Sequence, residues 1–160
     1  MARGVRYRKF IDLPDPRSLR GPSKVKVGFP AGEADGSNID KAFFNEFGTK
    51  GSGKPFGTER GGGFGGPIPE RPFMRNTMRS NRTKYLTAMK TSAVHILRGS
   101  VTIAATLQKL GVLAVRDIQK EIVSLTSPGN SPVTIAIKGS SNPLIDTGEM
   151  RQSVTYKIDD

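Results

Sequence analysis

The chain has 160 residues, of which only 35% are hydrophobic and 24% are charged, and its net charge is +11. It contains no cysteine, which excludes disulfides and thiolate ligands or nucleophiles. No run approaches about 18 consecutive apolar residues, and no apolar run of secretory-signal length follows the basic N-terminus. We therefore expect one domain, with neither a membrane span nor a secretory signal.

The positive charge is concentrated in two segments. Residues 1–27 and residues 68–100 each carry a net charge of +6, whereas residues 101–160 are neutral. Basic segments of this kind are typical of a surface that faces a polyanion, most often nucleic acid. They also occur on surfaces that provide solubility or pair with another subunit, so both interpretations stay open.

Residues 1–23 are predicted to form a basic extended arm, because prolines follow its charges and no periodic apolar face is present. Its basic residues with a possible role in facing DNA or another subunit are Arg3, Arg6, Arg8 and Lys9. Disorder is the alternative, since it is common at chain termini. Residues 24–160 are expected to form the folded domain.

The first part of this domain is predicted to contain a strand, a short helix and a loop. Apolar residues alternate over Lys24–Phe29, which indicates a strand. Ile39–Phe47 has helical spacing and is interpreted as a short helix or an irregular segment. Gly48–Gly66 follows as a loop with nine glycines in 19 residues. A phosphate-binding loop is not favoured, because the pattern GxxxxGK[ST] is absent.

Two long helices are predicted next. Prolines keep residues 67–73 extended and stiff, and a helix over Arg75–Arg98 follows. Its expected apolar face is Met78, Tyr85, Leu86, Met89, Ala93, Ile96 and Leu97, and its polar face carries Arg75, Arg79, Arg82, Lys84 and Lys90. Ser100–Thr126 has apolar residues at steps of three and four, with Ser100 as its expected N-cap. We expect this helix to be the packing centre, and Gly99-Ser100 either to separate the two helices or to kink one rod.

The C-terminal part combines an ambiguous segment, a capped turn and a strand. Ser131-Pro132 favours a short helix, whereas the alternating apolar residues of 133–137 favour a strand. Asp146 is predicted to cap a short helix, with Glu149 as its capping-box partner. Ser153–Ile158 alternates again and is predicted to be a closing strand, in antiparallel pairing with the first strand.

No catalytic constellation is evident in the sequence. His95 is the only histidine, and no carboxylate lies three or four residues from it. Asp117 and Glu121 are one helical turn apart, but basic residues flank both, so they are interpreted as a solvated charged edge. We expect no enzymatic activity, no cofactor and no metal.

Three stretches occur in a recognisable order. They are Asn45-Glu46-Phe47-Gly48-Thr49, Ile68-Pro69-Glu70-Arg71-Pro72-Phe73 and Leu144-Ile145-Asp146-Thr147-Gly148-Glu149-Met150-Arg151-Gln152-Ser153-Val154. With the long helical span between the second and the third, they resemble tail-completion and virion-morphogenesis proteins of long-tailed bacteriophages, the small neck proteins that finish the tail and join it to the head. The resemblance covers about residues 24–158. The basic arm and the length of the Gly-rich loop do not match the family pattern.

The resemblance implies a non-enzymatic α+β protein with a small, mostly antiparallel sheet packed on two long helices. It implies a homo-oligomeric ring, commonly a hexamer, around the channel for DNA, with other neck and tail proteins as partners and no membrane. The location would be the virion, after synthesis in the host cytoplasm. It also implies that Pro132–Gly139 is a short helix. Outside the arm, the basic residues expected to face the channel or a neighbouring subunit are Arg75, Arg79, Arg82 and Lys84.

One burial and one side-chain pairing are expected within the three stretches. Phe73 should be buried, and Arg71 is hypothesised to pair with Glu46 or Asp146. The alternative to a ring component is a free nucleic-acid-binding module, which the two basic segments favour. Against it, the chain has no tryptophan and no helix-turn-helix or zinc-finger spacing.

Overall fold

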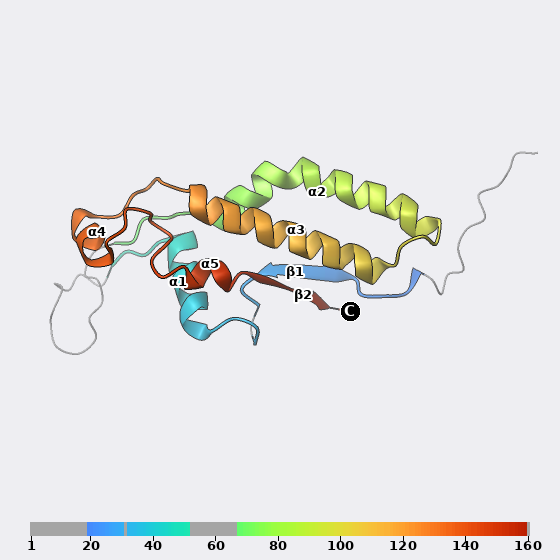
Figure 1. Cartoon of the computed structure of the whole chain (residues 1–160), viewed down its shortest axis with the longest axis horizontal. Coiled ribbons are helices and arrows are strands. Elements are labelled where there is room, and N and C mark those ends of the chain that lie inside the picture. Colours follow the sequence, from blue (N-terminus) through green and yellow to red (C-terminus); the bar gives the residue numbers. More distant parts are fainter. Residues whose placement is uncertain (1–18, 31, 52–66, 160) are drawn as a thin grey trace, which may run out of the picture.

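The computed structural model describes residues 19–30, 32–51 and 67–159, so most of the predicted arm and of the Gly-rich loop lies outside the described residues. Within these ranges the fold is α+β, with five helices and a two-stranded sheet. The elements in chain order are β1 (Lys24–Gly28), α1 (Gly36–Phe47), α2 (Phe73–Leu97), α3 (Ile103–Ser124), α4 (Pro132–Lys138), α5 (Glu149–Gln152) and β2 (Thr155–Asp159). The molecule is elongated along α2 and α3 (Figure 1).

Helix α3 is the packing centre, as predicted. It lies between α2 on one side and the two strands on the other (Figure 1). Ala114, Ile118 and Ile122 are buried at steps of four residues. The two isoleucines of this apolar stripe and Phe73 belong to the same hydrophobic core. Phe73 is fully buried, which confirms the expectation for that residue.

The connection between α2 and α3 is a tight turn and not a kink in one rod. Gly99 has a φ of 69°, a left-handed conformation that favours glycine after a helix. The Ser100 hydroxyl donates a hydrogen bond back to the carbonyl of His95 (3.0 Å). The prediction of Ser100 as the N-cap is wrong, because Thr102 Oγ1 accepts from the amide of Ala105 (3.2 Å) and the helix begins after it.

The sheet consists of the two predicted strands in the predicted antiparallel pairing. Val25 lies opposite Ile158, and Val27 lies opposite Tyr156. The sheet packs mainly on α3, and α2 covers the other side of that helix. Of the two expected long helices, α2 reaches the sheet only through its first turn, where Met74 lies against Gly28. Gly111 of α3 permits the close approach, since a Cβ there would lie 2.6 Å from the ring of Tyr156.

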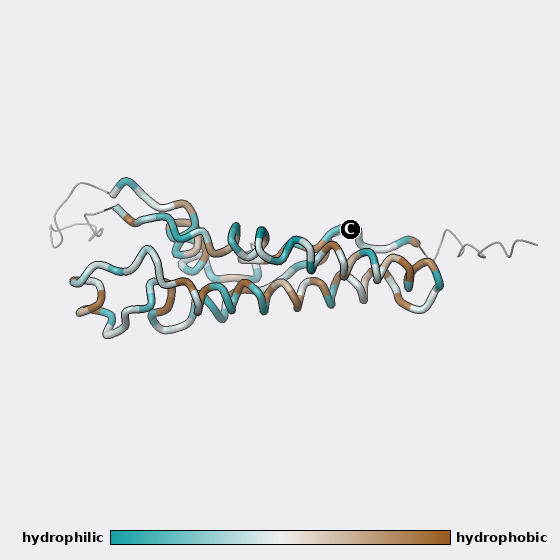
Figure 2. The backbone as a smooth tube through the Cα atoms, turned by 90° about the horizontal axis from the view of Figure 1, so that it is seen from above, coloured by the Kyte–Doolittle hydropathy of each residue, from teal (hydrophilic) through white to brown (hydrophobic). Residues whose placement is uncertain are grey.

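The rotation of α2 differs from the predicted one. Phe73 and Thr77 are buried. The half-buried positions that follow include Tyr85 and Ile96 of the predicted apolar face, and otherwise hold small or polar residues, namely Asn81, Ala88 and Ser92. The large apolar residues predicted to face the core but found exposed are Met78, Leu86, Met89 and Leu97. The tube coloured by hydropathy shows apolar segments along both long helices (Figure 2).

Polar contacts between α2 and α3 fix this rotation. The Asp117 carboxylate accepts hydrogen bonds from Lys84 Nζ (2.7 Å) and Tyr85 Oη (2.9 Å), and its side chain is only 11% exposed. Burial and the Asp117 carboxylate raise the pKa of Tyr85. Glu121 accepts from Asn76 Nδ2 (3.2 Å). The interpretation of these two acids as a solvated edge is therefore wrong, because they anchor α2 to α3.

The short helices begin and end at identifiable signals. Helix α1 starts earlier than predicted, because Asp35 Oδ2 accepts from the amide of Ser37 (3.0 Å). Residues 132–138 form helix α4, as the resemblance implies: Ser131 Oγ accepts from the amide of Thr134 (3.2 Å). Gly139 then ends the helix with a φ of 66°.

The predicted capping box before α5 is wrong. Gly148 occupies the cap position with a φ of 86°, and α5 begins at Glu149. Thr147 Oγ1 accepts from the amide of Glu149 (3.4 Å), and Asp146 is exposed. Because Gly148, and not Asp146, occupies the cap position, the Asp146 carboxylate does not bond the first amides of α5.

Candidate functional site

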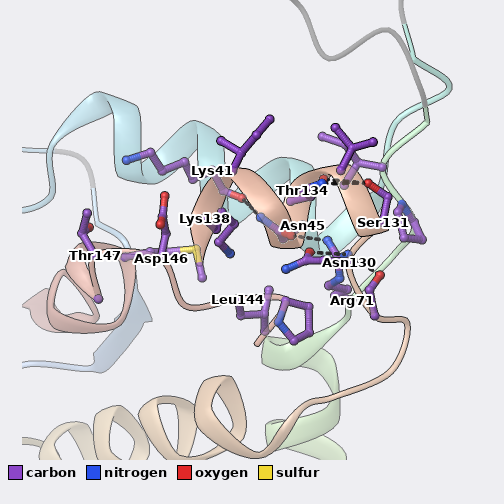
Figure 3. A pocket seen from close by; sticks show the side chains of 18 of the residues that line it. Lys41, Asn45, Arg71, Asn130, Ser131, Thr134, Lys138, Leu144, Asp146 and Thr147 are labelled. Atoms are coloured by element: carbon purple, nitrogen blue, oxygen red, sulfur yellow. Dashed lines mark hydrogen bonds between the residues drawn. The ribbon is translucent and has the colours of Figure 1, made fainter. Parts of the chain in front are cut away.

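The three recognisable stretches meet at one end of the molecule, around an open cavity of about 670 Å³ (Figure 3). Its walls come from α1, the extended segment 67–71, the loop 129–131, α4 and the segment 143–150. The labelled lining residues are Lys41, Asn45, Arg71, Asn130, Ser131, Thr134, Lys138, Leu144, Asp146 and Thr147.

Arg71 is buried at the centre of this end and joins three segments. Its Nη1 donates to Asn45 Oδ1 (2.9 Å), and its Nε and Nη2 donate to the carbonyls of residues 128 and 129 (2.9 and 3.0 Å). Nη2 also donates to Asn130 Oδ1 (3.2 Å). Burial lowers the pKa of the Arg71 guanidinium. Since all these acceptors are neutral, the hypothesised pairing of Arg71 with an acidic side chain is wrong.

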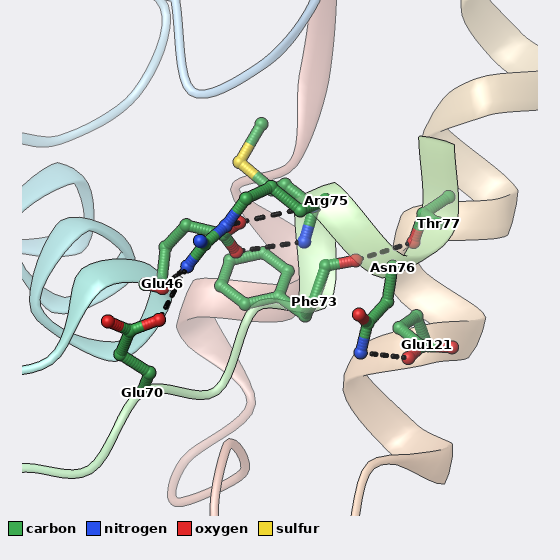
Figure 4. A network of polar contacts seen from close by, with 8 residues as sticks. Glu46, Glu70, Phe73, Arg75, Asn76, Thr77 and Glu121 are labelled. Atoms are coloured by element: carbon green, nitrogen blue, oxygen red, sulfur yellow. Dashed lines mark hydrogen bonds and ion pairs between the residues drawn. The ribbon is translucent and has the colours of Figure 1, made fainter. Parts of the chain in front are cut away.

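Glu46, one of the two acids proposed for Arg71, instead caps α2 (Figure 4). Its carboxylate accepts from the amides of Met74 (2.9 Å) and Arg75 (3.1 Å), and from Arg75 Nε (3.0 Å). Pro72 at the cap position supplies no side-chain hydrogen bond. Glu46 therefore satisfies two free amides of α2, and its charge is favourable at a helix N-terminus.

Asp146, the other acid, faces a different cation. Burial lowers the pKa of Lys138, and the charge of the nearby Asp146 carboxylate partly opposes this shift. Lys138 Nζ donates to the carbonyl of Asn142 (3.2 Å). Both residues line the cavity, so one of its cations and one of its anions are close to each other.

The first two stretches are clasped together next to the cavity. The amide of Thr49 donates to the carbonyl of Ile68 (2.8 Å), and the amide of Ile68 donates to Thr49 Oγ1 (3.2 Å). Gly48 has a φ of 69°, and a Cβ there would lie 2.8 Å from the carbonyl oxygen of Ile68. Pro69 is exposed beside this clasp and lines the cavity.

The third stretch is held by two asparagines that the sequence interpretation missed. Asn142 Oδ1 accepts from the amides of Leu144 and Ile145 (3.0 Å each), and Asn130 Nδ2 donates to the carbonyl of Asn142 (3.2 Å). Leu144 is buried in the core and Ile145 packs against it. The dipeptide Asn142-Pro143 is a turn signal that would have pointed to this residue.

The predicted DNA-facing or subunit-facing residues fall into three groups. Arg75 is engaged within the molecule, because it also binds Glu70 (3.1 Å) and covers the ring of Phe47 at 5.3 Å from its centroid. Lys84 is engaged with Asp117, as described above. Arg79 and Arg82 are exposed on α2, and the four basic residues of the arm lie outside the described residues.

Comparisons of the chain with protein-family models, curated proteins and solved structures found no match. In the described ranges, no group of three or more His, Asp or Glu side chains is placed to hold a metal ion. No helix of these ranges has the length and apolarity needed to cross a membrane. The cavity has mainly apolar walls with a few polar groups.

Proposed function

We propose that this chain is a non-enzymatic structural protein of a phage virion, which completes the tail end and joins tail to head as a ring around the DNA channel. The observation that carries the proposal is the distribution of apolar side chains. In the described ranges, more large hydrophobic side chains are exposed than buried, and most belong to α1, α2 and α4. Exposed apolar surface of this extent is characteristic of chains that are covered by partners.

The three resembling stretches support the proposal, because they meet at one joint, the contact of α1 with the start of α2 and the cavity beside it. The first supplies one acceptor for Arg71 and the cap of α2, and the second supplies Arg71 itself. The third lines the cavity opposite them. Such a joint would present α1 and α4 to neighbouring subunits at a fixed geometry. The exposed Arg79 and Arg82 would face a neighbouring subunit, and a ring around DNA would not read its sequence, since every base pair must pass.

An amber codon at Tyr85, introduced into the phage that carries this gene, tests the proposal. In a non-suppressing host we expect filled heads and tails that remain unjoined, seen by electron microscopy. A tagged copy supplied in trans should restore joining and should locate at the neck. Normal virions formed without the protein would contradict the proposed function.

A further inference from the structure

Helix α2 presents an apolar stripe that no described element covers. Met78, Leu86, Met89 and Leu97 lie on one helical face, and between 39% and 52% of each residue is exposed. At 1.5 Å per residue the stripe is about 29 Å long. Its first half is hollowed into a shallow groove, which is lined by Met78, Arg79, Arg82, Tyr85, Leu86 and Met89.

The charge of α2 restricts what can cover this groove. The helix contains no acidic residue. Arg79 and Arg82 line the groove, and within the described ranges neither has an ion-pair partner. Two copies of α2 packed face to face would therefore place like charges together. The occupant needs apolar side chains accompanied by a carboxylate.

The outer face of α1 has that combination. Phe43, Phe44 and Phe47 are 56%, 44% and 52% exposed, and their rings contact one another with centroid separations of 6.0 and 5.0 Å. Asp40 lies on the same helical face, because residues 40, 43, 44 and 47 follow helical spacing. Asp40 is exposed and has no ion-pair partner among the residues that the structure describes.

We propose that the outer face of α1 in one copy docks on the α2 groove of a second copy. The phenylalanine rings pack against Leu86 and against the two methionines, whose sulfur atoms make favourable contacts with aromatic rings. Asp40 pairs with Arg79 or Arg82. The two surfaces differ, so the contact can repeat from copy to copy and close into a ring. This inference rests on the proposed function, since it names the subunit contact of that ring.

Two variants of the full chain test the contact by removing one surface each. Phe44→Asp disrupts the α1 face, and Leu86→Asp disrupts the groove; both positions are about half exposed, so the fold should persist. Native mass spectrometry should show the wild type as an oligomer and each variant alone as a monomer. An equimolar mixture should contain a complex of twice the chain mass, because each variant keeps the surface that the other lacks. A monomeric wild type, or a mixture without this complex, would overturn the inference.

Two controls sharpen the test. Val112→Asp changes a 57% exposed apolar residue of α3 outside both surfaces, and the oligomer should persist. Asp40→Arg should raise the dissociation constant, and combining it with either Arg79→Asp or Arg82→Asp should recover most of the affinity. Equal weakening by Val112→Asp, or recovery in neither double variant, would contradict the contact. If the variants do not behave as expected but the amber phage leaves heads and tails unjoined, this contact alone is rejected. If the amber phage forms normal virions, the proposed function is rejected.

Discussion

Glu46 illustrates how one buried side chain replaces a missing helix cap. Its side chain is only 5% exposed, yet it carries a charge next to the first turn of α2. Two backbone amides and the Arg75 side chain donate to it, which offsets the cost of removing the carboxylate from water. The residue therefore fixes the end of α1 against the start of α2.

Replacing Glu46 by alanine should lower the free energy of unfolding by about 2–3 kcal/mol, because hydrogen bonds to a charged group are lost and helical amides are left without a partner. Urea denaturation measures the change. Glu70→Ala is the matched control, since Glu70 also binds Arg75 but its side chain is 60% exposed. A surface pair of this kind contributes less than about 1 kcal/mol. Equal losses in the two variants would contradict the capping role.

Arg71 should not tolerate lysine. A lysine ammonium cannot reproduce the planar set of donors that reaches Asn45, Asn130 and the carbonyls of residues 128–129. We expect Arg71→Lys to reduce the free energy of unfolding by about 2 kcal/mol, measured by thermal unfolding. Arg82→Lys, at an exposed position, should leave stability nearly unchanged. A stable Arg71→Lys variant would show that the guanidinium geometry is not required.

At the scale of elements, α3 depends on one glycine. Glycine inside a helix costs about 1 kcal/mol relative to alanine, so its presence at residue 111 needs a packing reason. The ring of Tyr156 occupies the space where a side chain would be. Gly111 thus sets how closely the sheet approaches α3.

Gly111→Ala should destabilise the protein by about 1–2 kcal/mol, because the cost of overpacking exceeds the gain in helix propensity. In a Tyr156→Ala background the same change should instead stabilise, since the clashing ring is absent. Chemical denaturation of the four chains in this cycle gives the coupling energy. Additive effects would exclude the proposed clash.

The C-terminal half of α2 should be less protected than α3. Its α3-facing positions from Ala88 onward are small or only half-buried, whereas α3 contains Ile118 and Ile122 in the core. Few buried contacts lower the free energy of local opening. Hydrogen exchange of the isolated chain should be faster over residues 86–97 than over residues 111–122. Equal protection in the monomer would contradict this difference.

At the scale of the whole molecule, the charge distribution predicts weak, sequence-independent attraction to DNA. Residues 68–100 carry a net charge of +6, but Arg75 and Lys84 are partly neutralised by acids of the same chain. We expect similar affinity for unrelated duplexes and a steep loss of binding with salt, because counterions are released from phosphates. A titration followed by fluorescence anisotropy measures both. Tight binding by a monomer would favour the alternative of a nucleic-acid-binding module.

The sequence by itself determined the features that depend on neighbouring residues. The period of apolar residues predicted α3 and both strands, since one stripe or alternating face must be buried. The cap signals around residues 131–139 favoured the helix that the structure shows, whereas the alternating apolar residues from Val133 to Ile137 favoured a strand. The hypothesis that Arg71 pairs with Glu46 or Asp146 linked the three stretches, although the acceptors of Arg71 are Asn45, Asn130 and two backbone carbonyls.

Only the tertiary structure decided which side chains pair. Arg71 has its acceptors 26 to 59 residues away, and Glu46 caps a helix that begins 27 residues later. The rotation of α2 depended on the burial of Phe73 and on Asp117, so several of its large apolar residues, Met78, Leu86, Met89 and Leu97, are exposed. Local periodicity identifies an apolar stripe, but it does not state whether the same chain or another copy covers it, because burial depends on what packs against the helix.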